Sequence, residues 1–387
     1  MKFDLIIVGG GLAGAALAVA LRRTALKIAL IEQAPPQRAP GWDARVYAYS
    51  PASARFLDEL GVWGHLDHRR LMPVAEMCVH GDAGGTLRFS AYESGLSELA
   101  WIGESSLLHV EIWESLKRQH NVRLLCPGIP VELALDAEAA RLRLADGKVL
   151  EAALVVGADG RDSWVRKQAG IAATVTPYDE RGVVANFRCE RPHRGTAFQW
   201  FCPDGVMAWL PLADGMMSMV WSAPNALADE LLKLDAEAFC ARVEAAGEHV
   251  LGRLEQVGER AAFPLRLMRV DQLARARVAL VGDAAHAIHP LSGHGINLGF
   301  QDAKVLADVL EALPSWEDPG EFSVLRRYAR RRAEEPFLLQ YTTHALSRLF
   351  SRREPLLSAL RNAGMNLTGQ VPVLKNALVR YAANGRF

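Results

Sequence analysis

The stretch that decides the fold covers residues 276–302 and reads ARVALVGDAAHAIHPLSGHGINLGFQD. The four apolar residues 278–281 are typical of a buried strand, and they lead directly into Gly282. From Ile296 onward the apolar residues recur at helical spacing. The stretch therefore predicts a strand, a glycine-rich loop and a helix.

This loop is suited to hold negative charge. A helix that begins near Gly295 presents the unpaired amides of Gly295, Ile296 and Asn297, and the positive end of its dipole lies there too. Asp283, beside Gly282 at the end of the strand, has a carboxylate that accepts hydrogen bonds from sugar or ribityl hydroxyls. A strand-loop-helix unit is as often plain scaffold as it is an anion-binding site. A second loop of this kind is needed to decide between the two.

The N-terminal segment carries that second loop. Residues 3–31 form an apolar run, an alanine-rich helix and another apolar run, which predicts a β-α-β unit. GGGLAG between the first run and the helix places Gly9, Gly11 and Gly14 in a GxGxxG pattern, which permits a tight turn, close approach of a pyrophosphate, and helix packing. Glu32 follows the second run, where a carboxylate binds an adenosine ribose. The motif alone fits FAD or NAD, and a further loop near residue 283 favours the longer flavin.

Composition excludes several classes of protein. A chain of 387 residues predicts two or three domains, and its 44 basic and 44 acidic residues give no net field for nucleic acid or an anionic membrane. The five cysteines are widely spaced and never CxxC, so we expect reduced thiols and no metal site. The start MKFDLIIVGGG lacks a signal-peptide pattern, and no apolar run is long enough to span a bilayer, so we expect a cytoplasmic protein.

Residues 154–166, LVVGADGRDSWVR, give a third strand-to-loop site with glycine and aspartate. Asp159 and Gly160 lie in the loop, while Ser163 and Arg166 are spaced to stand near a helix start. A plain capped turn has the same pattern. The functional interpretation depends on this being the third such loop in one chain.

Residues 182–268 predict an antiparallel sheet, hence a second domain inserted before the loop at Asp283. Five strand-like runs carry hairpin signals at residues 204–205 and 214–215, and one helix is expected over 227–245. The strands are bulky, and we expect most of these side chains in a core and about a third in an apolar pocket. The bulky residues are Trp200, Phe201, Met207, Trp209, Met217, Met219 and Trp221.

The C-terminal region is helical from about residue 319 and begins with an arginine-rich run at 326–332. Such a run is usually a solvated face. The amphipathic pattern of residues 346–380 is also compatible with docking on a membrane surface or a protein partner, which would place the protein at the inner membrane.

Three motifs now stand in one order: GGGLAG with Glu32, GADGRDSWVR at 157–166, and GDAAHAIHPLSGHGINLGFQD at 282–302. Together they resemble the single-component FAD-dependent aromatic hydroxylases over nearly the whole chain. DARVYAYS at 43–50 and the tail RNAGMNLTGQVPVLKNALVRYA at 361–382 are most similar to the ubiquinone-biosynthesis hydroxylases (UbiH/UbiF/VisC type).

The resemblance implies an α/β fold. It consists of an FAD-binding Rossmann-like domain (GR2 or p-hydroxybenzoate-hydroxylase type), an inserted antiparallel-sheet substrate domain, and C-terminal helices. The implied boundaries are 1–72, 101–176 and 266–318 for the FAD domain, 73–100 and 177–265 for the substrate domain, and 319–387 for the helices.

The resemblance also implies a set of cofactor-binding residues. The sequence departs from the family at two sites, since His294 replaces a common glutamine and Ser105-Ser106 replace a common Asn-Arg pair. The implied set is Gly9, Gly11, Leu12, Ala13, Gly14 and Glu32 for the ADP half, Arg45 beside the cofactor, Asp159 and Gly160 near the pyrophosphate, Gly282 and Asp283 for the ribityl chain, Pro290 at the ring edge, and Gly293, Gly295, Ile296 and Asn297 at the ring.

The implied activity is ring hydroxylation of a polyprenylated phenol by O2 through a flavin hydroperoxide, with NAD(P)H or an electron-transfer protein as reductant. His289 is the candidate base, and its alternative role is a structural hydrogen bond. Two other functions stay open. A hydroxylase of small soluble aromatics would need a buried cation, which residues 196–221 lack, and a non-catalytic FAD-binding subunit of a biosynthetic complex would not turn over.

Overall fold

The N-terminal strand-helix-strand unit is present and forms the centre of an eight-stranded sheet. The structure, a computed structural model, describes residues 1–202, 204–289, 293–351 and 354–384. The path of this first sheet is β17-β18-β11-β1-β2-β8, and β10 and β9 continue from β11. Its strands are β1 (Lys2–Val8), β2 (Ile28–Ile31), β8 (Val122–Leu125), β9 (Pro130–Leu135), β10 (Ala140–Leu144), β11 (Val149–Gly157), β17 (Ala274–Arg275) and β18 (Val278–Leu280).

Strands β18, β11, β1 and β2 run parallel, and this brings the three predicted loops together. Val8 at the end of β1 lies opposite both Gly157 of β11 and Ile31 of β2, and Gly157 lies opposite Leu280 of β18. Because the carboxyl ends of parallel strands meet at one edge of a sheet, ligands of such sheets bind there. All three glycine-bearing loops therefore leave the sheet side by side.

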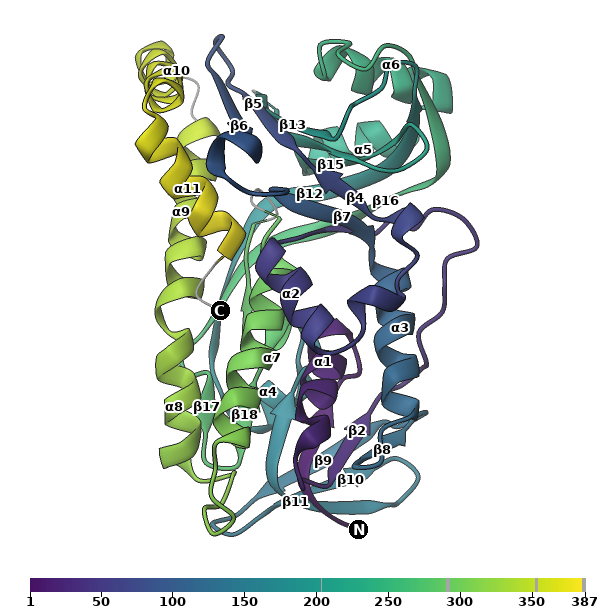
Figure 1. Ribbon diagram of the computed structural model, residues 1–387, viewed down its shortest axis with the longest axis vertical. Helices are drawn as coiled ribbons and strands as arrows, with labels where there is room; N and C mark the ends of the chain where they lie inside the picture. The colour runs from purple at the N-terminus through teal and green to yellow at the C-terminus, as the bar shows by residue number, and fades with distance from the viewer. Residues whose placement is uncertain (203, 290–292, 352–353, 385–387) are drawn as a thin grey trace.

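Three helices, α1 (Leu12–Ala20), α3 (Ser105–Lys117) and α7 (Gly295–Glu311), pack over the first sheet (Figure 1). Alanine makes α1 thin, since Ala15, Ala16 and Ala18 are fully buried. A Cβ built on Gly299 of α7 would lie 3.4 Å from the Cβ of Ala13. The short side chains thus let two helices that begin at the loop edge approach each other closely.

The second sheet is the predicted antiparallel one, and its order is β19-β16-β12-β15-β14-β13-β5-β6. Its strands are β5 (Glu76–His80), β6 (Thr86–Ser90), β12 (Ala173–Cys189), β13 (Thr196–Cys202), β14 (Gly205–Pro211), β15 (Met216–Pro224), β16 (Leu254–Val270) and β19 (His286–Ala287). The expected single helix over 227–245 is wrong. Two helices, α5 (Asn225–Lys233) and α6 (Ala236–Ala246), replace it, because Asp235 caps the amide of Ala238 and starts a new helix.

The two faces of the second sheet differ in bulk. Six of the seven bulky residues pack with α5 and α6 in one core, and Phe201 packs in another beside Phe350. Side chains alternate between faces along a strand, so the face turned toward the first sheet carries the smaller residues of β12, β14 and β15. There Asn186 donates through Nδ2 to the carbonyl of Asp43, 3.0 Å away.

A third, three-stranded sheet lies between the other two and consists of β3 (Val46–Tyr49), β7 (Ala100–Glu104) and β4 (Met72–Val74). Its residues join both neighbouring cores: Tyr49 packs with the helices of the first sheet, and Ile102 packs with Met216 of the second. The remaining short elements are α2 (Pro51–Glu59), α4 (Trp164–Gln168), η1 (Leu21–Arg23), η2 (Trp63–His65), η3 (His68–Arg70), η4 (Tyr92–Ser94) and η5 (Gly282–Ala284).

The C-terminal helices run along one side of the molecule and contact both large sheets (Figure 1). They are α8 (Phe322–Arg332), α9 (Glu334–Ser351), α10 (Pro355–Gln370) and α11 (Pro372–Asn384). The hydroxyl of Tyr328 on α8 donates to the carbonyl of Leu280 in the first sheet. Within the described residues, none of the helices has the length and apolarity that a membrane span requires.

Asp82, in the turn between β5 and β6, is the anchor for α10. Its carboxylate accepts hydrogen bonds from Arg361, Asn362 and Ser358. Burial alone would raise the pKa of Asp82, but these bonds outweigh burial and lower it to about 2. Because the folded pKa is depressed, the stabilisation is complete above the ordinary value of 3.8 and is lost as the pH falls toward 2.

We therefore predict that Arg361→Leu loosens this turn at neutral pH. Hydrogen exchange of residues 80–86 should lose protection in the variant at pH 7, whereas the wild type should lose it only below about pH 4. Arg326→Leu, at an exposed position of α8, is the matched control and should leave the turn protected. Equal protection in the wild type and Arg361→Leu at pH 7 would show that the turn does not need the hydrogen bonds from Arg361 to Asp82.

Candidate active site

Where β1 turns into α1, two of the three motif glycines, Gly9 and Gly14, have no room for a side chain. Gly9 has φ +102°, and a Cβ on it would lie 2.4 Å from the carbonyl oxygen of Ala158. A Cβ on Gly14 would lie 2.1 Å from the carbonyl oxygen of Gly9. At Gly11, the N-cap of α1, a Cβ would meet no described atom within 4 Å. The first-turn amides of α1, which include those of Leu12 and Ala13, have no side-chain cap and face a space that a phosphate fits.

Glu32 stands at the same edge as predicted. Its Oε2 accepts from the amide of Gly10 at 2.7 Å, and its Oε1 accepts from the amide of Gln33 at 2.8 Å. Two contacts of Gly10 were not foreseen: His109 of α3 contacts its carbonyl at 2.7 Å, and a Cβ on it would lie 2.8 Å from Trp113. The triple glycine signalled the second constraint, but nothing in the sequence signalled His109.

In the second loop the carboxylate of Asp159 accepts hydrogen bonds from groups at the start of α4, the helix that follows it. It accepts from the hydroxyl of Ser163 at 2.5 Å and from the amide of Val165 at 3.0 Å, so it caps α4. Gly160 follows with φ +81°. Arg166 reaches the third loop, where its guanidinium donates to the carbonyl of Ala284 at 2.9 Å. Asp159 therefore orders the second loop itself, and Arg166 ties it to the third.

The third loop rests on a buried charge network. Asp302 of α7 accepts from the amide of Gly282 at 2.9 Å, from His286 at 2.7 Å, and from Nε of Arg332 at 2.7 Å. Burial alone would raise the pKa of Asp302, but His286 and Arg332 outweigh it and keep the pKa below its ordinary value. A Cβ on Gly282 would lie 3.2 Å from the Cβ of Ala13. The third loop therefore passes close to the first turn of α1.

The start of α7 is tied to β3 by a side chain. Asn297 accepts from the amide of Ser50 at 2.9 Å and donates to the carbonyl of Ala48 at 2.9 Å. Gly293, with φ +62°, lies beside Ala48 as well. The N-cap residue His294 gives no side-chain cap, so the amides of Gly295, Ile296 and Asn297 start the helix uncapped. Pro290 lies outside the described residues.

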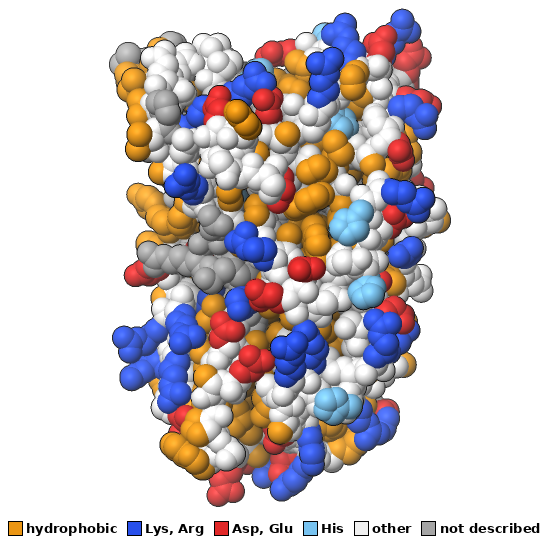
Figure 2. Space-filling view, viewed as in Figure 1, with side chains coloured by type: hydrophobic (Ala, Val, Ile, Leu, Met, Phe, Trp, Pro, Cys, Tyr) orange, Lys and Arg blue, Asp and Glu red, His pale blue; other side chains and the backbone are white. Residues whose placement is uncertain are grey.

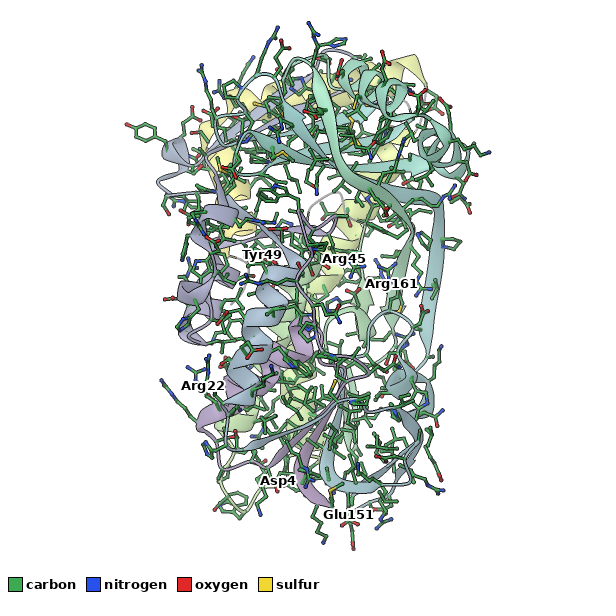
Figure 3. The ribbon with its side chains drawn as sticks, turned by 90° about the vertical axis from the view of Figure 1, so that its right-hand side faces the viewer. Asp4, Arg22, Arg45, Tyr49, Glu151 and Arg161 are labelled. Atoms are coloured by element: carbon green, nitrogen blue, oxygen red, sulfur yellow. The ribbon has the colours of Figure 1, made fainter. Side chains whose placement is uncertain are left out.

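Tyr47 of β3 is a member of the site that sequence reasoning missed, although it lies within the quoted DARVYAYS. Burial raises the pKa of its hydroxyl; Asp283 raises it further, while Arg45, a hydrogen bond with Ser105, and Arg161 lower it. Figure 3 shows Arg45 and Arg161 at mid-height of the molecule, far from Asp4 and Glu151 at the end of the first sheet. The side chain of Asp283 is exposed toward this region.

Ser105 and Ser106, which replace the common Asn-Arg pair, start α3 beside Arg45. The amide of Ser105 donates to the carbonyl of Arg45 at 3.0 Å. The carboxylate of Asp43 accepts from the amide of Ser106 at 3.0 Å and from the amide of Arg45 at 2.8 Å. Asp43 thereby caps the helix start and holds the backbone of Arg45 at the site.

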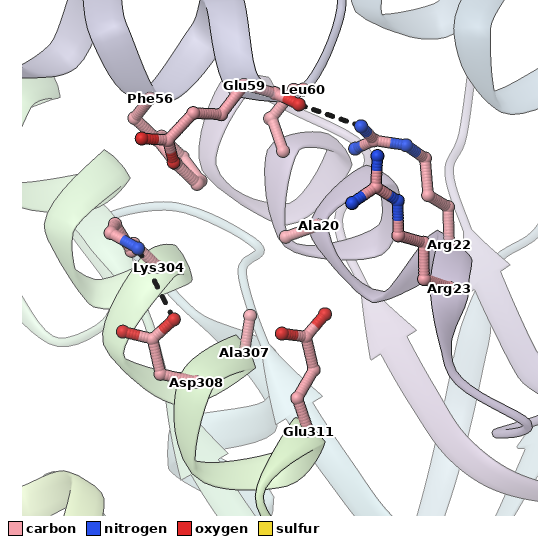
Figure 4. Close-up of a pocket in the computed structure, with 10 residues that line it drawn as sticks. All are labelled: Ala20, Arg22, Arg23, Phe56, Glu59, Leu60, Lys304, Ala307, Asp308 and Glu311. Atoms are coloured by element: carbon pink, nitrogen blue, oxygen red, sulfur yellow. Dashed lines mark hydrogen bonds and ion pairs between the residues drawn. The ribbon is translucent and has the colours of Figure 1, made fainter.

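The cavity of about 170 Å³ shown in Figure 4 is not part of this edge. It is lined by Arg22, Arg23, Glu59, Lys304, Asp308 and Glu311 around Ala20. Ala20 ends the nine-residue helix α1, which places it about 13 Å from the loop at Gly11. Its charged walls do not suit an apolar ring.

Comparison with known proteins identifies the family. Residues 4–48 and 130–336 match two family models that both describe an FAD binding domain. The ubiquinone hydroxylase UbiL of Rhodospirillum rubrum is 36% identical over 385 residues, which cover 98% of this chain and 89% of that protein. The 3-demethoxyubiquinol 3-hydroxylase of Escherichia coli K12 is 34% identical over 98% of both chains. The chain belongs to this family of FAD-dependent monooxygenases.

Solved structures agree with this assignment of the monooxygenase fold. The p-nitrophenol 4-monooxygenase PnpA of Pseudomonas putida DLL-E4 superposes with a TM-score of 0.80 over 100% of this chain and 99% of its own, at 20% identity. PqsL of Pseudomonas aeruginosa, described as a probable FAD-dependent monooxygenase, gives a TM-score of 0.76 at 26% identity, over 94% of this chain and 99% of its own. The predicted FAD-binding fold is thus confirmed.

The loop edge of this monooxygenase fits FAD by its own geometry. The free space at Gly11 would accommodate a pyrophosphate, the starts of α1 and α7 would present two positive helix ends, and the carboxylate of Glu32 would accept from a ribose hydroxyl. When bound, FAD supplies the electron transfer and oxygen activation. The role of the protein is to bind and orient the cofactor and to exclude water.

Proposed function

We propose that this monooxygenase hydroxylates the aromatic ring of a polyprenylated phenol or quinone precursor of ubiquinone, with O2 as co-substrate and NAD(P)H as reductant. The observation that carries the proposal is the absence of basic residues from three neighbouring strands of the second sheet, β13, β14 and β15. Strands β13, β14 and β15 contain no Arg or Lys, so these three strands offer no cation for a carboxylate. The two named relatives are hydroxylases of ubiquinone and of 3-demethoxyubiquinol by name.

Polar groups on the neighbouring strands β12 and β15 suit a neutral head group. Asn186 of β12 and Ser218 of β15 lie opposite each other and are buried. Asn186 Oδ1 and Ser218 Oγ have no hydrogen-bond partner among the described residues. Buried polar atoms without partners are costly. A phenol hydroxyl can donate to one and a quinone or methoxy oxygen can accept from the other.

The residues that would hold FAD are those at the loop edge. Gly9, Gly11, Leu12, Ala13, Gly14 and Glu32 would bind the ADP half, Arg45 and Gly160 would flank the pyrophosphate, Gly282 and Asp283 would bind the ribityl chain, and Gly293, Gly295, Ile296 and Asn297 would face the ring. Asp159 would support the cofactor indirectly, by holding the loop that carries Gly160, because its carboxylate already caps α4. His289 would accept the proton of the substrate hydroxyl.

The proposal is tested with FAD-loaded protein, NADPH and a short-chain prenylated phenol. We expect hydroxylated product, and NADPH oxidation stimulated by the phenol rather than by a free aromatic acid. Asn186→Leu should raise KM for the phenol about tenfold, since one buried hydrogen bond is lost, while retaining FAD. Stimulation by an aromatic acid alone would favour the small-aromatic alternative. FAD binding without oxygen consumption with NADPH or a reduced electron-transfer protein would favour the non-catalytic subunit.

The outer face of α8 and α9 supports peripheral contact with an anionic membrane surface. Arg326, Arg330 and Arg331 are exposed on α8, and Phe337 and Tyr341 are exposed on α9. Figure 2 shows basic side chains gathered over α8 and hydrophobic ones over α9 along the same side. Arginine beside aromatic residues suits a bilayer interface. Sedimentation with vesicles that contain anionic lipid, against neutral vesicles as control, tests this contact.

A further inference from the structure

Helix α3 contacts two of the segments that would hold FAD. Its start is tied to the segment around Arg45, because the amide of Ser105 donates to the carbonyl of Arg45 at 3.0 Å. One turn further along the helix, Nε2 of His109 lies 2.7 Å from the carbonyl oxygen of Gly10 in the first loop. The helix therefore sets the spacing between the first loop and the segment around Arg45.

The backbone of Gly10 is held at both of its polar groups. Its amide donates to Oε2 of Glu32 at 2.7 Å, and its carbonyl is bound by His109. A carbonyl oxygen only accepts, so Nε2 of His109 carries the hydrogen of this bond. Side chains also enclose the residue, since a Cβ on Gly10 would lie 2.8 Å from Trp113 and 3.0 Å from Leu30. The backbone at Gly10 is therefore fixed in one orientation.

The direction of this carbonyl decides where the next amide points. The peptide bond between Gly10 and Gly11 is trans. In a planar trans peptide the C=O and N–H bonds point in opposite directions. The carbonyl of Gly10 is directed at His109 on α3, so the amide of Gly11 is directed away from α3.

The amide of Gly11 is available to a ligand. It donates to no other group in the part of the chain that the structure describes, and a Cβ on Gly11 would meet no described atom within 4 Å. Because Gly11 is the N-cap of α1, its amide stands beside the free amides of the first turn, at the positive end of the helix dipole. Such a group of amides suits a phosphate oxygen.

We propose that His109 is a positioning residue for FAD, which holds the carbonyl of Gly10 toward α3 and thereby directs the amide of Gly11 at the pyrophosphate. The proposal rests on the assignment of the ADP half of FAD to the first loop under the proposed function. Without the bond from His109, the carbonyl oxygen of Gly10 can turn toward the phosphates and repel their negative charge. Only a fraction of the molecules is then ready to bind FAD, and the affinity falls accordingly.

The first test is the affinity of the full-length apoprotein for FAD, measured by the change in flavin fluorescence on titration. His109→Leu keeps apolar bulk between α3 and the loop but removes the donor, so the dissociation constant should rise about tenfold. His109→Met also lacks a donor and adapts more easily to its surroundings, so it should give the same loss. Wild-type affinity in these two variants would overturn the proposal.

Two further variants control this test. His109→Gln keeps a side-chain N–H within reach of the carbonyl of Gly10, so its affinity for FAD should stay within about threefold of the wild type. His120→Leu makes the same change as His109→Leu at an exposed position just beyond α3, and it should bind FAD like the wild type. A loss in His109→Gln as large as that in His109→Leu would mean that the hydrogen bond is not what matters, and would overturn the proposal.

The second test is the ³¹P spectrum of FAD bound at saturation, which reports on the pyrophosphate directly. The two phosphorus signals should move in His109→Leu and return to their wild-type positions in His109→Gln. A residue that only packs α3 against α1 would instead make the variant easier to unfold in urea and leave both signals at their wild-type positions. That result would also overturn the proposal.

Gly11→Ala separates this proposal from the assignment of the first loop. Reduced FAD affinity in Gly11→Ala together with wild-type affinity in His109→Leu and His109→Met overturns the role of His109 alone. Wild-type affinity in all three variants overturns the assignment of the first loop to the ADP half of FAD, and with it the role of His109.

Discussion

Asp302→Asn is expected to lower the free energy of unfolding by about 3–5 kcal/mol, the usual cost of removing one partner from a buried ion pair. Asp302 is fully buried, and Arg332 is 1% exposed. The two carboxylate oxygens of Asp302 accept hydrogen bonds from the amide of Gly282, from His286 and from Arg332. An asparagine would direct its NH2 group at one of these donors. Urea unfolding at pH 7 measures the loss.

The same substitution should weaken FAD binding, because the amide of Gly282 loses its anchor and the third loop is released. The pH dependence has a definite sign. The depressed pKa of Asp302 means that its contribution is complete above the ordinary value of 3.8 and declines as the pH falls through the folded value. The difference in stability between wild type and variant should therefore shrink in acid.

Asp308→Asn is the matched control, since it makes the same change on the same helix. Asp308 pairs with Lys304 at 3.3 Å, but its side chain is 44% exposed. Exposed pairs contribute about 0–1 kcal/mol, so unfolding and FAD affinity should stay near the wild type. Equal effects of the two substitutions would mean that burial of the network under Gly282 does not matter.

The sequence predicts the parts of this fold whose causes are local. Glycines at Gly9, Gly11 and Gly14 and the apolar runs around them indicate loops after strands, and parallel pairing then brings those loops together. An Asp-Gly pair indicates a hairpin without fixing its turn type. Asp214-Gly215 has positive φ at both residues, as a type I′ turn requires, whereas in the hairpin between β10 and β11 only Gly147 of the Asp146-Gly147 pair has positive φ.

The parts that sequence reasoning missed depend on pairing between distant segments. Glu180 reaches His289 only because β12 bulges against β16, and no residue type at 178–180 announces that register. In the sequence Asp302 is one polar residue of a helical stretch, and its role depends on Arg332, which α8 brings to it. The sequence of β14 and β15 does not indicate which face of the sheet α5 and α6 cover. In the structure these helices cover the face that carries the bulky side chains.

Gly11→Ala is expected to separate cofactor binding from folding. A Cβ at Gly11 meets no described atom within 4 Å, and its φ of −64° is one that alanine adopts readily. The folded chain should therefore tolerate the change, with unfolding within about 0.5 kcal/mol of the wild type. The added methyl group occupies the space where the backbone must approach a pyrophosphate. Overpacking of about 1–3 kcal/mol corresponds to FAD affinity about 5- to 150-fold lower.

Gly14→Ala is the informative partner of that variant, three residues further along, in the first turn of α1. Its Cβ would lie 2.1 Å from the carbonyl oxygen of Gly9 and 2.8 Å from Ala158, so the backbone itself must shift. Folding and FAD binding should fail together, as seen by urea unfolding and by flavin retention on purification. If Gly11→Ala retains full FAD affinity, the pyrophosphate does not lie at the start of α1, and the assignment of the first loop to the ADP half of the cofactor is wrong.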